Sequence, residues 1–396
     1  MSEVAQVTHS SPDGHIPQLR LPQFSHDWAI STIGNLAKID TGNRDTQDRV
    51  NSGKYPFYVR SNTVERINEY AFDGEAILTS GDGVGVGKNF HYVVGKFNYH
   101  QRVYSIHNFT NSTNGKFIYY YFADKFYRRV SRLSAKNSVD SVRMSMISDM
   151  PISIPAKPEQ QKIAAFLTAV DNKIEQLSKK QELLGEYKKG LMQQIFSQAI
   201  RFKADDGCDF PDWEEKSLGE LFNYKNGGSF ENEVVKDGLY NLITLNSITI
   251  DGELKNEHKK INSFDNSLKI NDLIMVLSDV AHGNFLGLTA IIPEDNSYVL
   301  NQRMGALKSK GLNNVVFLRL LINYNQKYFK LHGQGSSQQN LSKGDILKFE
   351  LLLPNRNEQQ KIANFLSSID TKIEQVGKQL DESKQFKKAL LQQMFV

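Results

Sequence analysis

Residues Glu159 to Phe196 read EQQKIAAFLTAVDNKIEQLSKKQELLGEYKKGLMQQIF, and residues Glu358 to Phe395 read EQQKIANFLSSIDTKIEQVGKQLDESKQFKKALLQQMF. About half of the aligned positions are identical, at a constant offset of 199 residues (358 − 159). So long a period is typical of a duplicated domain, because solenoid repeats recur roughly every 20–50 residues. The sequence therefore predicts two equivalent modules, each followed by the same element, with internal two-fold character.

Both repeated segments are predicted to be long helices. Apolar residues recur in alternating steps of four and three, which gives a narrow seam of coiled-coil type, and a proline at 155 or 354 stands where a helix can begin. About 38 residues exceed an ordinary globular helix, so we favour pairing of the two helices as a rigid spacer over two separate core helices. The expected helix-pairing seam consists of Ile163, Leu167, Val170, Ile174, Leu177, Ile362, Leu366, Ile369, Ile373 and Val376.

Composition narrows the class of protein. No apolar run approaches the roughly 18 residues of a membrane-spanning helix, so no membrane partner is expected. A single cysteine, Cys208, suits a reducing cytosol, and the expected location is cytoplasmic. Residues 28–154 carry 16 basic and 11 acidic side chains, a net +5, which suits a polyanion. Residues 213–353 carry 15 basic and 16 acidic side chains, a net −1, and do not indicate nucleic acid by charge alone.

The segments before the two helices are related more distantly. Ala76–Asp82 resembles Leu273–Asp279, and both are predicted to be buried strands that run into a turn. A helix is predicted to follow in each module, at Phe117–Arg132 and Val315–Leu331. A common scaffold with divergent loops is what two readers of different ligands would have.

The whole pattern, two variable modules each closed by a proline and then EQQKIA-FL-x3-D-x-KIEQ, resembles the specificity subunit of type I restriction–modification systems. The likeness runs from about Trp28 to Phe395, and the duplicated Glu159–Gln176 and Glu358–Gln375 segments are its most specific part. The resemblance implies that each module is a target-recognition domain for one half of a split double-stranded DNA site. It also implies that the repeated helices pair antiparallel, set the gap between half-sites and dock two modification subunits.

The same resemblance implies an adaptor that is not itself an enzyme and holds no cofactor. S-adenosylmethionine is then expected in the modification subunits, and ATP and Mg in the restriction subunits that translocate and cut DNA. The expected fold class is α+β: two mixed α/β target-recognition domains in a pseudo-two-fold arrangement, separated by two long antiparallel coiled-coil helices. The expected parts are a flexible N-terminal arm (1–27), a first target-recognition domain (28–154), a first spacer helix (155–203), a linker (204–212), a second target-recognition domain (213–353) and a second spacer helix (354–396).

The sequence agrees with the absence of chemistry. An adenine methyltransferase would need an Asn/Asp-Pro-Pro-aromatic loop, and no Pro-Pro pair exists in the chain. The stretch Gly81–Lys88 fails the P-loop pattern, because Asp82 stands where a glycine is needed and Asn89 where Ser or Thr is needed; it is interpreted as a tight turn or as a loop that touches DNA. The crowded acidic residues of Asp212–Lys216 do not indicate a nuclease, and the histidines lack metal-ligand spacing.

Base recognition uses Arg or Lys for guanine, Asn or Gln for adenine, and carboxylates for cytosine, whereas Lys, Arg and Ser also bind phosphates. The candidates in the first module are basic residues near aromatic ones, together with basic residues and one asparagine on loops, and the alternative is a solvated basic face: Arg44, Arg60, Asn62, Lys88, Lys125, Arg128, Arg129, Arg132 and Lys136. In the second module they lie after the second strand and in a polar glycine-rich stretch, with a plain surface loop as the alternative: Asp279, His282, Asn284, Gln334, Ser336, Ser337, Gln338, Gln339 and Asn340.

Two further hypotheses remain open at this point. Gln101–Arg102 recurs as Gln302–Arg303, and residues that distinguish two half-sites should differ between modules, so we expect a scaffold or phosphate role for this pair. The alternative to DNA reading is a coiled-coil scaffold that joins proteins, which the −1 charge of the second module leaves open.

Overall fold

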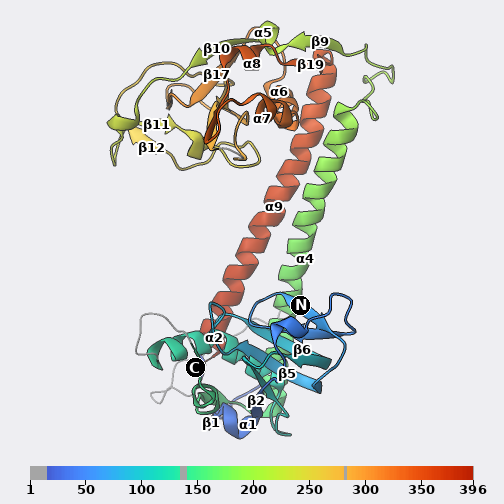
Figure 1. Ribbon diagram of the computed structural model, residues 1–396, viewed down its shortest axis with the longest axis vertical. Helices are drawn as coiled ribbons and strands as arrows, with labels where there is room; N and C mark the ends of the chain where they lie inside the picture. The colour runs from blue at the N-terminus through green and yellow to red at the C-terminus, as the bar shows by residue number, and fades with distance from the viewer. Residues whose placement is uncertain (1–15, 134–140, 281–282, 396) are drawn as a thin grey trace. The chain divides into compact units, whose positions relative to one another are not determined.

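The structure, a computed structural model, describes residues 16–133, 141–280 and 283–395. Contacts divide the chain into two compact units, Met1–Lys180 with Val376–Val396, and Gln181–Gln375. Each unit contains one module, the first part of one long helix and the last part of the other (Figure 1). This division differs from the expected succession of module and spacer, because each module packs against the start of one long helix and the end of the other.

Two long continuous helices correspond to the repeated segments. Helix α4 is Lys157–Phe196, with 40 residues, and α9 is Arg356–Met394, with 39 residues. Each begins just after the proline that the sequence places there. The helix of the expected segment 155–203 ends at Phe196, and Phe202, which follows it, packs against the core of the second module. The prediction of two long helices is therefore confirmed.

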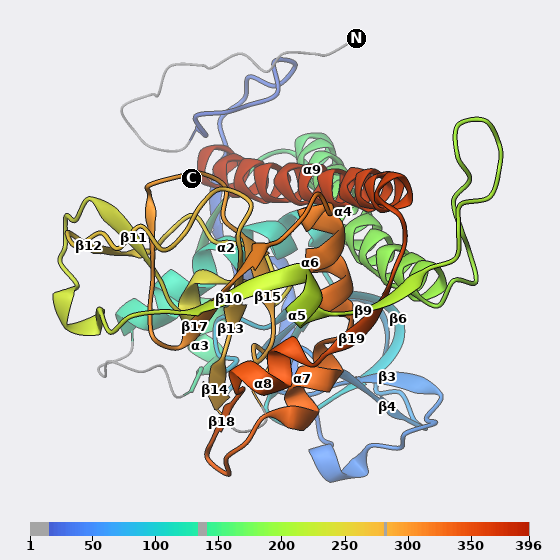
Figure 2. The ribbon, with the colours of Figure 1, turned by 90° about the horizontal axis from the view of Figure 1, so that it is seen from above.

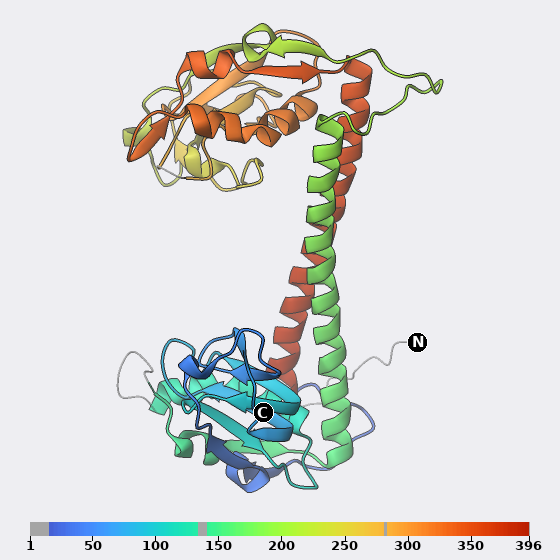
Figure 3. The ribbon, with the colours of Figure 1, turned by 45° about the vertical axis from the view of Figure 1, so that its right-hand side comes forward.

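The two helices run antiparallel within each unit (Figure 3). In the first unit Lys387 of α9 lies 2.6 Å from Asp171 of α4. In the second unit Lys188 of α4 lies 2.6 Å from Asp370 of α9. These four residues are equivalent under the repeat, so the same ion pair forms twice with the helices exchanged.

The first module is built on a six-stranded sheet with strand order β2-β7-β5-β6-β3-β4, in which the antiparallel hairpin of β5 and β6 is the longest pairing. A second, two-stranded sheet pairs β1 with β8 and so joins the start of the module to its end. The elements are β1 Ala29–Thr32, α1 Ile33–Leu36, β2 Lys38–Thr41, η1 Thr46–Asp48, β3 Tyr55–Tyr58, β4 Val64–Ile67, β5 Phe72–Ser80, β6 Phe90–Tyr99, β7 Val103–His107, α2 Gly115–Leu133, α3 Met144–Ser148 and β8 Pro151–Ile154.

The second module repeats this plan with shorter strands. Its sheets have strand orders β10-β17-β13-β15 and β12-β11-β16, and two-stranded sheets pair β14 with β18 and β19 with β9. The expected single helix over Val315–Leu331 is broken at Asn325 into two. The elements are β9 Glu214–Ser217, α5 Leu218–Leu221, β10 Phe222–Asn226, η2 Glu231–Glu233, β11 Tyr240–Ile243, η3 Leu245–Ser247, β12 Lys259–Ile261, β13 Leu273–Val276, β14 Ser278–Val280, β15 Thr289–Ile291, β16 Tyr298–Leu300, β17 Met304–Ser309, α6 Val315–Tyr324, α7 Gln326–His332, β18 Gln338–Asn340, α8 Lys343–Leu347 and β19 Glu350–Leu353.

The main hydrophobic core of each unit contains residues from both long helices. In the first unit Ile163 at the start of α4 and Met394 at the end of α9 join a core around Trp28 and Phe117. In the second unit the corresponding core unites Ile195 at the end of α4 with residues at the start of α9. Burial of apolar area on this scale is the main source of stability, so each helix end is held by a module.

The expected helix-pairing seam thus serves two purposes. Five of its members lie in the module cores rather than between the helices alone: Ile163, Leu167, Ile362, Leu366 and Ile369. Val170 and Ile373 pack partly against the same cores. The seam residues farther along, Leu177 and Val376, are also buried, and Ile174 is half-buried. A one-dimensional apolar pattern cannot tell a partner helix from a module, which is why the sequence assigned all of them to helix pairing.

Candidate DNA-recognition interface

In the second module the structure brings two groups of candidate residues together. Strands β14 and β18 pair antiparallel and lie side by side in Figure 2. Their register places Ser278 opposite Asn340 and Asp279 opposite Gln339. The polar stretch after β13 and the glycine-rich stretch near residue 335, which are about 55 residues apart in the chain, therefore form one structure.

Some of these candidates are occupied by internal contacts. Asp279 is buried, and its carboxylate accepts hydrogen bonds of 2.8 Å from the backbone N–H groups of Val280 and Phe285. The Gln338 amide donates to the Ser278 hydroxyl, and Asn284 accepts from the Lys330 ammonium group at 3.2 Å. Asp279 and Gln338 therefore shape the loop. His282 lies outside the described residues.

The remaining candidates form an exposed polar turn. Gln334 and Asn340 exchange backbone hydrogen bonds of 3.0 and 2.9 Å, which closes a tight hairpin between them. Gly335 has φ +120°, a conformation that other residues rarely adopt. Gln334, Ser336, Ser337 and Asn340 are exposed, and Gln339 is half-buried. The Asn340 amide also donates to the Gln338 carbonyl at 3.3 Å and accepts from the Gln338 side chain at 3.4 Å, so it helps to hold the hairpin. The hairpin thus presents amides and hydroxyls to solvent, as contact with base edges requires.

The first module has the same connection in a different form. The residue after β5, Gly81, accepts a 2.7 Å hydrogen bond from the Val142 N–H, and Asp82 bridges to Ser141. The stretch between α2 and Ser141 therefore takes the place in the chain of the 334–340 hairpin. It contains the candidate Lys136, which lies outside the described residues. Asp82 itself pairs with the candidate Arg60 at 3.2 Å.

Four of the basic candidates converge in the first module. Lys125, Arg128, Arg129 and Arg132 of α2 line a surface pocket of about 710 Å³, together with tyrosines and the start of β8. Arg129 is held in place, because its guanidinium group donates to the carbonyls of Met146 at 2.8 Å and Asp149 at 3.0 Å. Arg128 and Arg132 are exposed. Such a fixed and exposed cluster of cations fits a polyanion.

The other candidates of the first module lie apart from the pocket lining or are engaged. Lys88 lies 5.7 Å from the ring of Tyr127, which lines the pocket, so the glycine-rich turn 81–88 borders it. Lys125 also donates to the Phe395 carbonyl at 3.2 Å. Arg44 forms an ion pair with Glu69, and Asn62 is exposed.

The repeated Gln-Arg pair lies at a matching place in the backbone of the two modules. The Arg102 carbonyl accepts from the Gly81 N–H at 2.7 Å, and the Arg303 carbonyl accepts from the Leu277 N–H at 3.0 Å. In both modules the turn is thereby fastened to the end of the strand that leads to the candidate loop. Both contacts are made by backbone carbonyls, so a scaffold or phosphate role for the Gln and Arg side chains stays a prediction.

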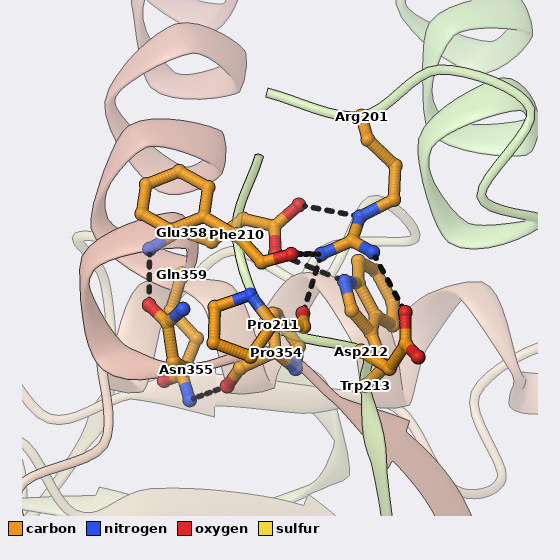
Figure 4. A network of polar contacts seen from close by, with 9 residues as sticks. All are labelled: Arg201, Phe210, Pro211, Asp212, Trp213, Pro354, Asn355, Glu358 and Gln359. Atoms are coloured by element: carbon orange, nitrogen blue, oxygen red, sulfur yellow. Dashed lines mark hydrogen bonds and ion pairs between the residues drawn. The ribbon is translucent and has the colours of Figure 1, made fainter. Parts of the chain in front are cut away.

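Each module is attached to its helix by a buried glutamate. Glu358 of α9 is fully buried, and Arg201 donates to both of its oxygens, from Nε at 3.1 Å and from Nη2 at 2.7 Å (Figure 4). The Trp213 indole N–H donates to the same carboxylate at 3.1 Å. Hydrogen bonding to Glu358 raises the pKa of Arg201 above its usual value. In the first module Glu159 accepts from Arg20 at 2.8 Å and 2.8 Å and from Trp28 at 3.3 Å.

The next residue of the repeat fixes the module helix. Gln160 accepts from the backbone N–H of Asn114 at 2.8 Å and donates to the Pro155 carbonyl at 2.7 Å. Gln359 accepts from the backbone N–H of Asn314 at 2.9 Å and donates to the Pro354 carbonyl at 2.8 Å. The Glu-Gln of the repeat is therefore identical in both copies because both side chains are buried and fully used.

Sequence reasoning missed Arg20 and Arg201 as partners of these glutamates. A signal was present: each arginine stands between two apolar residues, in Leu19-Arg20-Leu21 and Ile200-Arg201-Phe202, a short way before the Trp of its module. Within the part of the chain that the structure describes, no group of three or more His, Cys, Asp or Glu side chains is arranged to hold a metal ion. No helix among the described residues is long and apolar enough to cross a membrane.

The structure therefore defines a protein with two copies of one module, each attached to parts of both long helices and each with its own exposed loops. The family described as "Type I restriction modification DNA specificity domain" matches residues 25–184 and 211–382. The chain belongs to this family. The match favours DNA reading over the protein-scaffold alternative.

Individual relatives agree with this assignment. The chain is 28% identical over 196 residues to the type I restriction enzyme EcoDI specificity subunit of Escherichia coli, an alignment that spans 50% of this chain and 42% of that protein. It is 24% identical over 407 residues to the type I restriction enzyme MjaVIII specificity subunit of Methanocaldococcus jannaschii, covering 94% of this chain and 92% of that protein. The fold resembles the type I restriction–modification S subunit from M. genitalium, with a TM-score of 0.65 at 19% identity over 96% of this chain and 99% of that one. The expected α+β class is confirmed.

Proposed function

We propose that this chain is the DNA-binding specificity subunit of a type I restriction–modification complex. Each module reads one half of a bipartite, asymmetric double-stranded site, and the paired helices set the gap between the half-sites. The helices also dock two modification subunits. The complex works in the cytoplasm, where the DNA is accessible to it.

The observation that carries this proposal is that the contacts between module and helix are the same in both modules, whereas the exposed candidate residues differ. The attachment of module to helix is the same twice, down to the Glu-Arg-Trp contacts. The exposed candidates differ: arginines around a pocket in the first module, and amides and hydroxyls on a hairpin in the second. Arginine suits guanine or phosphate and amides suit adenine, so two different half-sites are expected.

The chain itself supplies recognition without catalysis. S-adenosylmethionine would be bound by the modification subunits, and ATP and Mg by restriction subunits that translocate and cut DNA. This division of labour also accommodates the net −1 charge of the second module, because basic residues of a docked subunit would add to the DNA affinity.

The test is a genome-wide map of adenine methylation by long-read sequencing, with the modification subunit expressed together with this chain and again without it. A split motif that appears only when this chain is present is the expected result, and it would give both half-sites and the gap. No chain-dependent motif from a demonstrably assembled complex would contradict the proposal.

A further inference from the structure

The segment before the first module and the segment before the second dock on equivalent helix ends. In the first unit the Leu19 N–H donates to the Gln393 carbonyl of α9 at 3.0 Å. In the second unit the Ile200 N–H donates to the Gln194 carbonyl of α4 at 3.1 Å. Gln194 and Gln393 are equivalent under the repeat, although one segment continues from a helix and the other belongs to the N-terminal arm.

The arginine that follows each docking point makes a matching set of contacts. Arg20 binds both oxygens of Glu159 and also donates to the carbonyl of His26, two residues before Trp28. Arg201 binds both oxygens of Glu358 and donates at 2.7 Å to the carbonyl of Pro211, two residues before Trp213. Each arginine thus ties the start of a long helix to the chain that enters the first strand of a module.

The ion pairs of Arg20 with Glu159 and of Arg201 with Glu358 are largely buried. The Arg20 side chain is 5% exposed and the Glu159 side chain 2%. In the second copy the Arg201 side chain is 24% exposed and the Glu358 side chain 0%. Buried ion pairs contribute little net stability compared with apolar residues of the same volume, but their two-pronged geometry fixes an orientation, and this is their best-attested use.

We infer that Arg20 and Arg201 are positioning residues, each of which sets the angle at which one reading module leaves the helix pair. This inference rests on the proposed function. The arm residues around Arg20 consequently belong to the reading of the first half-site, as the linker around Arg201 belongs to the reading of the second. Base contacts require side chains held to within roughly half an ångström, so a small tilt of the module lowers discrimination between bases before it unfolds the module.

The test uses the full complex with its modification subunits and duplexes in which single bases of the first or the second half-site are changed. Arg201→Lys keeps the charge but loses the planar fork. We expect methylation by this variant to lose roughly tenfold of its discrimination at the second half-site and none at the first, since one specific base contact that is misplaced by the tilt carries on the order of a factor of ten in discrimination. Arg20→Lys is the matched control and should show the reverse.

A double variant separates positioning from stability. Arg201→Leu alone leaves the buried Glu358 carboxylate unpaired and should lower the melting temperature. Adding Glu358→Gln removes the second charge, so the melting temperature should rise again toward that of the wild type, while discrimination at the second half-site stays low. Recovery of full discrimination together with the melting temperature would overturn the inference, as would an equal loss at both half-sites in Arg20→Lys or Arg201→Lys, or no loss in either.

Hydrogen exchange gives a readout that needs no DNA. In Arg20→Lys the amides of Ala29–Thr32 should exchange faster while those of Glu214–Ser217 keep the wild-type rate, and Arg201→Lys should reverse this pattern. If the wild-type complex methylates no split motif but this exchange pattern holds, the proposed function fails and the positioning role stands. If the amides of Ala29–Thr32 and of Glu214–Ser217 exchange at the same altered rate in both variants, or at the wild-type rate in both, the positioning role is overturned while the proposed function is untouched.

Discussion

The two modules are most alike where they are buried and most different where they are exposed. At the helix starts, Glu159 and Glu358 have the same partners, and the next residue, a glutamine, makes the same pair of backbone contacts. On the exposed side, the first module presents arginines of α2 around a pocket, and the second presents the hairpin between Gln334 and Asn340. The two copies have therefore kept the contacts that attach each module to the helices, whereas their exposed residues have diverged.

Under the proposed function, this difference separates the residues that position a module from the residues that would contact DNA. Buried polar groups tolerate few substitutions, because an unpaired donor or acceptor costs about 1–3 kcal/mol and an unpaired charge costs more. Exposed loop residues carry no such penalty, so they are free to change with the ligand. Variants at the buried and at the exposed positions should accordingly give opposite kinds of defect.

The largest expected effect comes from changing the helices that both modules share. Seven residues inserted in α4 after Lys180 and in α9 after Gln375 keep the heptad register and lengthen each helix by about 10.5 Å. Binding to the original site should be lost, and the methylated motif should keep its half-sites with a gap altered by up to about three base pairs, since one pair occupies about 3.4 Å. A methylation map measures this.

The matched control for that experiment is the insertion in α4 alone. This insertion lengthens α4 but not α9, so the Lys188–Asp370 and Lys387–Asp171 ion pairs cannot both form. We expect no methylated motif from this variant. A double insertion that recognised new bases with the old gap would refute the spacer role.

A smaller effect is expected from the pocket of the first module. Replacing Arg128, Arg129 and Arg132 together by Gln should weaken DNA binding whatever the sequence and should make the slope of log affinity against log salt shallower by about 2.7, because three fewer counterions are released. Fluorescence anisotropy over a salt series measures the slope. Unchanged affinity and slope would remove this pocket from the DNA interface.

The hairpin of the second module should respond in the opposite way. Gln334→Ala removes an exposed amide and should relax the preference at one position of the second half-site by about 1–3 kcal/mol, with the salt slope and the first half-site unchanged. Competition binding with single-base substitutions measures this. Asp279→Ala is the contrasting variant: it removes the acceptor that shapes the loop, so it should lower discrimination at several positions at once.

The sequence predicted the duplication, the two long helices and a buried strand that runs into a turn in each module, because each rests on local periodicity or on comparison of the chain with itself. The α+β class followed from the family resemblance. It assigned Ile163 and Leu167 to helix pairing alone, although they lie in the core of the first module. Apolar spacing reports that a face is buried and does not report what covers it.

The contacts of Arg20 with Glu159 and of Arg201 with Glu358 show a second limit of sequence reasoning. Arg20 lies 139 residues from Glu159, in a stretch whose polar composition indicated a loose arm. Its role depends on a long-range contact, and no local pattern specifies such a contact. The polar candidates of the second module were predicted from the sequence. The sequence did not predict that β14 pairs with β18, and it is this pairing that brings Asp279 next to Gln339.

The smallest prediction concerns a contact that only the first module has. The Tyr120 hydroxyl donates to Asp171 at 2.8 Å, and Asp171 also binds Lys387 at 2.6 Å, so the module is tied to both long helices. The position equivalent to Tyr120 in the second module is Leu320, which has no hydroxyl. Burial, reinforced by Asp171, raises the pKa of Tyr120, so the hydroxyl remains a donor at physiological pH.

The Tyr120 hydroxyl also contacts the Thr168 hydroxyl at 3.2 Å, so Tyr120→Phe should destabilise the first unit by about 1–2 kcal/mol and leave the second unit unchanged. Hydrogen exchange of α2 and of the first half of α4 measures the change unit by unit, which a single melting temperature would average. Tyr119→Phe is the control, because its ring is half-buried among aromatic neighbours while no hydrogen bond of its hydroxyl is seen among the described residues. Equal effects of the two variants would mean that the tie through Asp171 adds nothing, and that the two modules are held to the helices by the same contacts alone.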